Sequence, residues 1–160
     1  MSAEGPESPI PSQDTGGTAD ASSVDSSPVE ELTERELAFL HSVFDLARDG
    51  ETQKLNALLD QGLPVNLTDA KGDTLLILGA YREQLEIVQL LIQRGADLDR
   101  MNDRGQTALV SAVFRNHEPI VRCLLEAGAD ASLGSQTPQA VAEFFDLPQM
   151  ARLLSEHRQS

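Results

Sequence analysis

The stretch GQTALVSAVFRNHEPIVRCLLEAGAD, residues 105–130, repeats an earlier stretch, GDTLLILGAYREQLEIVQLLIQRGAD, residues 72–97. The two align without a gap at an offset of 33 residues, and each begins with Gly-x-Thr and ends with Gly-Ala-Asp. A fixed period of this length is typical of stacked-repeat proteins, in which each unit buries its apolar face against its neighbours. The sequence therefore predicts a solenoid.

Each repeat divides into a turn, a helix, a short reversal and a second helix that ends at a glycine. Residues 69–73 are rich in turn formers, and Thr74 is placed to cap a first helix. Apolar residues at helical spacing predict a second helix over 85–93, and the glycine that follows can adopt the left-handed conformation of a helix C-terminus. The next unit predicts helices over 107–115 and 119–127.

The pattern extends in both directions, with end units that differ from the central ones. In the first unit no glycine turn precedes the first helix, and Thr33 with Glu36 forms a capping box instead. The last unit is three residues shorter, since Thr137 lies 30 residues after Thr107. An end unit of a solenoid has no neighbour on one side, so we expect both to act as caps.

The N-terminal residues differ in composition from the repeats. Residues 1–34 contain eight carboxylates, no Lys or Arg and few apolar residues, too little apolar surface to offset the entropy of ordering. We therefore expect a disordered acidic tail over 1–34 and a repeat domain over 35–158. The expected units of that domain are about 35–66, 67–99, 100–132 and 133–158.

Charge and composition also bear on where the chain acts. No basic segment followed by an apolar run opens the sequence, and no stretch approaches the roughly 18 apolar residues of a membrane span. Cys123 is the single cysteine, so an internal disulfide is excluded, and we expect a cytoplasmic monomer that does not bind membranes. A formal net charge of −14 argues against a nucleic-acid partner, because the chain would repel phosphate.

The repeat motif resembles that of a known family. Gly-x-Thr-x-Leu at 72–76, with Ile-Val-x-x-Leu-Ile-x-x-Gly-Ala-Asp at 87–97, resembles the ankyrin repeat, and the following unit resembles it more closely, with Gly-x-Thr-Ala-Leu at 105–109 and Asn-His at 116–117. The resemblance covers about residues 36–157. It implies an all-α ankyrin-repeat solenoid of about four helix-turn-helix units with short β-turn fingers.

The chain departs from the family pattern at a few positions. The family's Thr-Pro-Leu-His is Thr-Leu-Leu-Ile at 74–77 and Thr-Ala-Leu-Val at 107–110, and its Gly-His is Glu83-Gln84 in one unit. We expect these losses to loosen the hydrogen bonding of the turns without removing the fold. A small stand-alone protein with a short acidic leader is similar to bacterial members of the family.

The resemblance implies protein–protein recognition through the finger tips and the exposed side of the first helices, without a reaction. We therefore expect a non-catalytic binding module or adaptor with a protein partner and no cofactor. A second hypothesis is a dedicated chaperone-like or accessory protein that stabilises one partner enzyme, for example in a stress response. Fold alone does not identify a partner.

Positions that project outward in the family define a candidate binding surface. Tyr81, Phe114 and Phe144 share one repeat position in successive units and form an aromatic ladder, while Arg82 and Arg115 form an arginine row at the next position. Rigid rings bury area at low entropy cost and guanidinium groups pair with carboxylates, so we expect this groove to hold a peptide or loop with an apolar anchor and a nearby acid. The predicted partner-binding residues are Arg48, Lys71, Leu78, Tyr81, Arg82, Arg104, Ser111, Phe114, Arg115 and Phe144.

Two of these features have a second interpretation. The rings of the aromatic ladder could fill the seam between the two helices of each repeat and serve the fold alone. The acidic tail is either a solubilising segment or an autoinhibitory strand that folds back on the arginine row, a contact that salt would weaken.

The sequence offers no grouping of catalytic or metal-ligating residues. His41, His117 and His157 lie far apart in the repeats, and His117 takes the family's histidine position before a second helix, where we expect a local hydrogen bond. The acidic residues of the turns lack the regular ligand spacing and closing bidentate Glu of a calcium loop. Cys123 is expected to be a buried small hydrophobe. We therefore predict no enzyme and no metal site.

Overall fold

The computed structural model describes residues 32–159, which divide into two compact units, one ending at Leu40 and one beginning at His41. The predicted disordered tail over 1–34 lies almost entirely outside the described residues. The described chain is all helical, as the sequence predicts. Its helices are α2 (Glu34–Asp49), α3 (Thr52–Asp60), α4 (Leu75–Tyr81), α5 (Leu85–Gln93), α6 (Ala108–Phe114), α7 (Glu118–Glu126), α8 (Pro138–Phe144) and α9 (Pro148–Gln159).

Before Leu40 the described chain consists of the start of α2, and its N-terminus has the predicted capping box. The Thr33 N–H donates to Glu36 Oε1 at 2.9 Å, and the Glu36 N–H donates to Thr33 Oγ1 at 3.0 Å. This reciprocal pair satisfies donors that have no partner within the helix. The capping-box prediction is confirmed.

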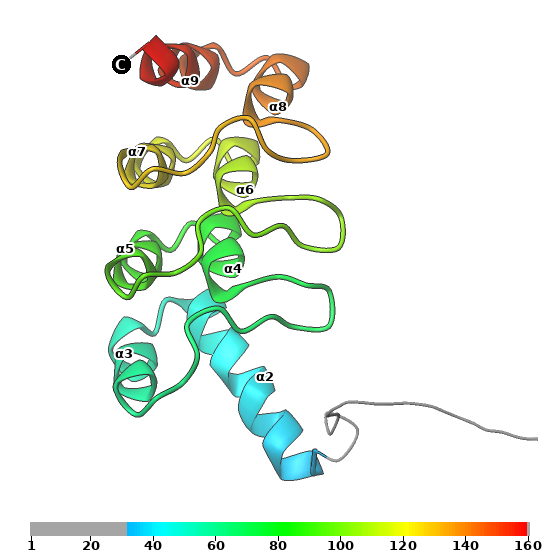
Figure 1. Cartoon of the computed structure of the whole chain (residues 1–160), viewed down its shortest axis with the longest axis vertical. Helices are drawn as coiled ribbons and strands as arrows, with labels where there is room; N and C mark the ends of the chain where they lie inside the picture. Colours follow the sequence, from blue (N-terminus) through cyan, green and yellow to red (C-terminus); the bar gives the residue numbers. More distant parts are fainter. Residues whose placement is uncertain (1–31, 160) are drawn as a thin grey trace, which may run out of the picture. The chain divides into compact units, whose positions relative to one another are not determined.

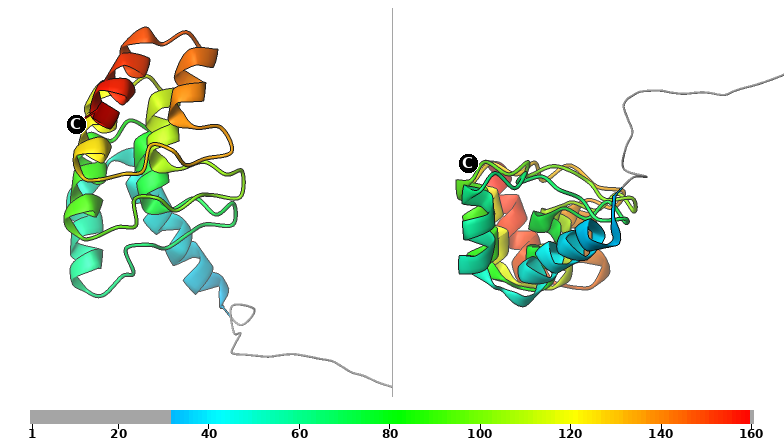
Figure 2. Two further views of the ribbon diagram at one scale, coloured as in Figure 1. Left: turned by 45° about the horizontal axis from the view of Figure 1, so that its top comes forward. Right: turned by 90° about the horizontal axis from the view of Figure 1, so that it is seen from below.

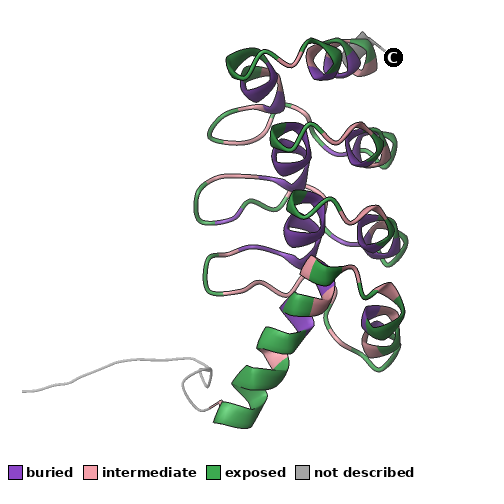
Figure 3. Cartoon of the chain, turned by 180° about the vertical axis from the view of Figure 1, so that it is seen from behind, coloured by how far each residue is buried: buried purple, intermediate pink, exposed green. Residues whose placement is uncertain are grey.

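From His41 onward the helices pack in two rows. Helices α4, α6 and α8 form one row, and α3, α5, α7 and α9 form the other (Figure 1). Across the two rows α4 packs on α5, α6 packs on α7 and α8 packs on α9. Helix α6, between α4 and α8, is buried from Ala108 to Val113, whereas α8 buries only Pro138, Val141 and Ala142 (Figure 3). The predicted stack of two-helix units is confirmed, and α8 has the exposed character of an end unit.

The turns between units project as fingers on the same side of α4, α6 and α8 (Figure 2). Asp69 Oδ1 accepts the backbone N–H groups two and four residues further on, at 2.9 and 3.0 Å. Asn102 Oδ1 does the same in the next finger, at 2.9 and 3.0 Å. Short polar side chains at the turn start therefore close both fingers in the same way.

The two repeat glycines have matching surroundings. Gly72 and Gly105 have φ of 79° and 75°, and both lie where one finger meets the next. The Gly72 N–H donates to Asp69 O at 3.0 Å, and the Gly105 N–H donates to Asn102 O, the equivalent acceptor in the next finger, at 2.9 Å. A Cβ on Gly72 would lie 2.6 Å from Asp103 Oδ1, so this close approach requires glycine. The repeat symmetry thus holds at the level of backbone hydrogen bonds.

The reversal between first and second helix also follows the repeat. Gly50, Glu83, Asn116 and Asp146 all have positive φ, although only the first is a glycine. The Gln84 N–H donates to Gly79 O at 2.9 Å, equivalent to the 3.1 Å bond of the His117 N–H in the next unit. The expected loosening of the turn is therefore wrong for the backbone.

The departure from Gly-His changes the side-chain capping of the second helix instead. His117 Nδ1 accepts a long hydrogen bond of 3.4 Å from the Ile120 N–H, which confirms its predicted local role. Gln84 makes no such bond to α5. Its Nε2 donates to Arg48 O at 2.8 Å and so links consecutive units.

Candidate functional site

Two adjoining depressions lie between the fingers and the first helices. The aromatic depression, about 540 Å³, is lined by three rings, Tyr81, Phe114 and Phe145, together with Val110 and Val141. The cationic depression, about 320 Å³, is lined by Arg48, Lys71, Arg82 and Arg104 together with Asp69 and Asp73. Both are also lined by Tyr81, Arg104, Gln106 and Ser111, so they form one continuous groove.

The rings are exposed. The fractional exposures of Tyr81, Phe114, Phe144 and Phe145 are 43%, 45%, 77% and 47%. Tyr81 and Phe114 are stacked with centroids 6.2 Å apart, and Phe145 meets the edges of Phe114 at 5.3 Å and Phe144 at 4.9 Å. These four residues, here called the aromatic shelf, form a continuous exposed surface. They do not fill the seam between the helices.

The order of the rings differs from the predicted ladder. Phe144 is the repeat counterpart of Phe114, yet the ring that contacts Phe114 is Phe145. The residue that follows the ladder position contacts the preceding unit, since the Arg115 guanidinium lies 5.2 Å from the Tyr81 ring centroid. In the last unit this position is Phe145, so an aromatic ring takes the place of a guanidinium.

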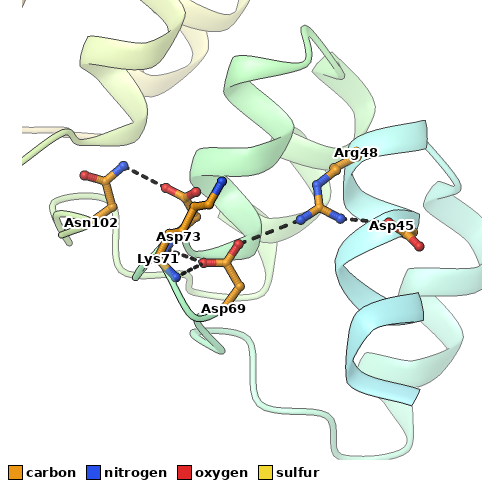
Figure 4. A network of polar contacts seen from close by, with 6 residues as sticks. All are labelled: Asp45, Arg48, Asp69, Lys71, Asp73 and Asn102. Atoms are coloured by element: carbon orange, nitrogen blue, oxygen red, sulfur yellow. Dashed lines mark hydrogen bonds and ion pairs between the residues drawn. The ribbon is translucent and has the colours of Figure 1, made fainter. Parts of the chain in front are cut away.

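The predicted cations differ in whether they are already paired. Arg48 pairs with Asp45 at 2.7 Å and lies 3.8 Å from Asp69 (Figure 4). Arg115 pairs with Glu83 at 2.8 Å as well as covering Tyr81. Within the described part of the chain no ion pair holds the side chains of Lys71, Arg82 and Arg104.

Leu78 and Ser111 do not project outward as predicted, because both are buried on the first helices. Ser111 Oγ donates to Thr107 O at 3.1 Å, which uses the hydroxyl within its own helix. Both residues line the floor of the cationic depression. Asp73 is buried too, and it accepts a 2.7 Å hydrogen bond from Asn102 Nδ2 that joins neighbouring fingers (Figure 4).

The sequence prediction omitted the apolar part of the groove wall. Ile77 lines the cationic depression and Val110 the aromatic one, and both lie three residues after a capping threonine. This shared repeat position is the one feature of the sequence that could have identified Ile77 and Val110 as groove residues. It gave no reason to distinguish them from core residues, and both are in fact buried.

The described residues contain no group of three or more His, Cys, Asp or Glu side chains that could hold a metal ion. Cys123 is half-buried, and not fully buried as predicted. Burial, and secondly the negative charge of Glu126, raise the pKa of the Cys123 thiol above its ordinary value. The thiolate that redox chemistry requires is therefore disfavoured.

No helix within residues 32–159 has the length and apolar character needed to cross a bilayer.

Comparison with known proteins agrees with this architecture. Residues 43–135 match the family described as ankyrin repeats, in three copies, which in general are protein–protein interaction modules and typically have no catalytic activity. A stretch of 64 residues is 48% identical to a Pseudomonas aeruginosa protein named "Putative ankyrin repeat protein". The similarity covers 40% of this chain and 37% of that relative's length. The chain belongs to the ankyrin-repeat family.

Proposed function

We propose that this chain is a non-catalytic binding module or adaptor that holds a partner protein in the groove formed by the aromatic and cationic depressions. The observation that carries the proposal is the aromatic shelf, whose four rings touch one another and remain 43–77% exposed. Contiguous exposed apolar surface with a polar rim is typical of interaction sites. The single cysteine, which is free, supports the cytoplasm as the place of action.

The shelf is held in place before any partner arrives. Tyr81, Phe114 and Phe144 are each the last residue of a first helix, and Phe145 is the C-cap of α8. Because these helices stack on one another, the backbone positions that carry the rings have fixed spacing. A preformed surface loses little conformational entropy on binding, and aromatic residues commonly dominate binding energy.

The test is affinity capture by the full chain from its native cell, comparing Phe114→Ala with Met101→Ala. Met101 is as exposed as the rings, at 47%, but lines neither depression, so it is a matched control. We expect a stoichiometric partner to be retained by the wild type and by Met101→Ala and lost by Phe114→Ala. Equal retention by both variants would contradict a partner site in the groove.

A further inference from the structure

We infer that the groove recognises an acidic protein segment in which carboxylates lie next to a bulky apolar side chain. The carboxylates pair with Lys71, Arg82 and Arg104, and the apolar side chain lies in the aromatic depression. The inference rests on the proposed function, because it names the chemistry of the partner at the same site. Its support comes from the charge, the apolar lining and the continuity of the two depressions.

The cationic depression is locally positive in a strongly acidic chain. It has four cationic side chains against two carboxylates, whereas the whole chain has a net charge of −14. Asp69 accepts two backbone hydrogen bonds and lies 3.8 Å from Arg48, and Asp73 accepts one hydrogen bond from Asn102. Because Asp45 pairs with Arg48, the other three cations of the depression remain against these two carboxylates, so the balance of the lining is positive.

Three cations outside the groove, Lys54, Arg94 and Arg122, are paired among the described residues. Lys54 pairs with Glu51, the N-cap residue of α3, Arg122 pairs with Glu118 on α7, and Arg94 pairs with Asp60 of the preceding unit. Among residues 32–159, the groove cations Lys71, Arg82 and Arg104 have no such pair. Their charge is therefore available to carboxylates of a ligand, and a guanidinium can take a carboxylate in two parallel hydrogen bonds.

The aromatic depression has a largely apolar wall, and Arg104 is the one cation among the described residues that line it. Arg115, whose guanidinium lies over the Tyr81 ring, is also held by Glu83. Val110 and Val141 line the wall beside Phe114 and Phe145. A concave apolar lining of this kind suits an aliphatic or aromatic side chain of the partner.

The two depressions meet at shared residues, so the acid and the apolar anchor of a ligand must lie next to each other. Tyr81 and Arg104 line both, so an acid and an apolar anchor that are adjacent in one segment can occupy both depressions together. A nucleic acid would meet repulsion from the acidic remainder of the chain, which has a net charge of −14.

The experiment is a fluorescence-anisotropy titration of the full chain with labelled synthetic peptides. The main probe has a run of Asp and Glu next to Phe-Leu, made in both orders because the segment can run either way along the groove. In one comparison peptide Lys replaces every acid, and in another Ser-Gly replaces Phe-Leu. We expect the better order of the main probe to bind at least about tenfold more tightly than either comparison peptide, and less tightly as salt rises.

Two groove variants separate the contributions. Arg82→Ala with Arg104→Ala should remove the preference for acids and most of the salt dependence, while Phe145→Ala should remove only the preference for Phe-Leu. The matched control, Arg100→Ala with Arg152→Ala, makes the same change of charge at exposed sites outside both depressions and should leave binding unchanged.

Three results would overturn the inference. The first is no binding of the main probe in either order up to about 1 mM, the weakest affinity that gives a useful binding energy. The second is binding of the Lys peptide, or of a single-stranded DNA oligonucleotide, as tight as that of the main probe. The third is loss of affinity in the control variant equal to that in the groove variant. If capture still depends on Phe114 while the peptides are not discriminated, the proposed function stands and this inference fails.

Discussion

At the scale of single residues, the left-handed reversal positions show how the repeat tolerates sequence change. Asp146 has a φ of 56° at the position that Gly50 occupies in the first unit. A non-glycine residue in this conformation costs about 1–2 kcal/mol, and aspartate reduces that cost by local hydrogen bonding. The repeat therefore keeps its backbone at this position while its side chain varies.

Asp146→Gly should equal or exceed the wild type in stability, because glycine adopts positive φ without strain. Asp146→Ala, the matched variant, should be less stable than Asp146→Gly by about 1 kcal/mol in urea unfolding. Alanine has neither the freedom of glycine at positive φ nor the local hydrogen bonding of aspartate. An alanine variant as stable as the glycine variant would show that the strain is absent in solution.

The thiol of Cys123 gives a prediction about pH. Burial and Glu126 raise its pKa, so at neutral pH a smaller fraction is thiolate than in an unstructured peptide. Iodoacetamide should therefore alkylate Cys123 more slowly in the native chain than in denaturant. The alkylation rate of the native chain should rise at a higher pH than the rate in denaturant. A native rate equal to the denatured rate between about pH 7 and 8 would contradict this assignment, since an unperturbed thiol titrates near 8.5.

At the scale of elements, threonine caps define the first helices. Thr107 Oγ1 accepts the Val110 N–H at 3.1 Å and is buried, as Thr74 is in the preceding unit. Thr107→Ala should lower the free energy of unfolding by about 1–2 kcal/mol, because a buried donor at the N-terminus of α6 loses its partner. Thr107→Ser should recover most of that loss; equal losses in both variants would assign the effect to the methyl group.

Helix positions could be predicted from the sequence because their signals are local. The second helix over 85–93 was predicted at its observed bounds, and those over 107–115 and 119–127 differ by one residue at each end. Capping threonines, helical spacing and stop glycines act within a few residues, so one sequence is enough to read them.

The detail of the site could not be predicted because it depends on contacts between units. Alignment places Phe144 in the ladder, but the direction in which side chains leave the helix ends makes Phe145 the neighbour of Phe114. Leu78 and Ser111 align with outward positions of the family but are buried beneath the groove. Repeat position alone does not give exposure, since that depends on what the next finger covers.

At the scale of the repeat stack from His41 onward, stability should be highest at the centre. Residues 75–80 of α4 and 108–113 of α6 are buried throughout, whereas α8 exposes more of its surface. Hydrogen exchange measured by mass spectrometry should find the slowest amides in α4 and α6 and faster exchange in α8, because end units open more readily. Slowest exchange in α8 would contradict this order.

The central claim is that the rings of the aromatic shelf are surface for a partner and not part of the core. The free energy of unfolding of Phe114→Ala, measured against the wild type by urea denaturation, tests it most directly. Phe114 contacts two exposed rings, each pair worth about 0.5–1.5 kcal/mol, so its loss should cost about 1–2 kcal/mol and remain below about 3 kcal/mol. A loss of about 3 kcal/mol or more, the range for removing a core aromatic, would contradict the claim.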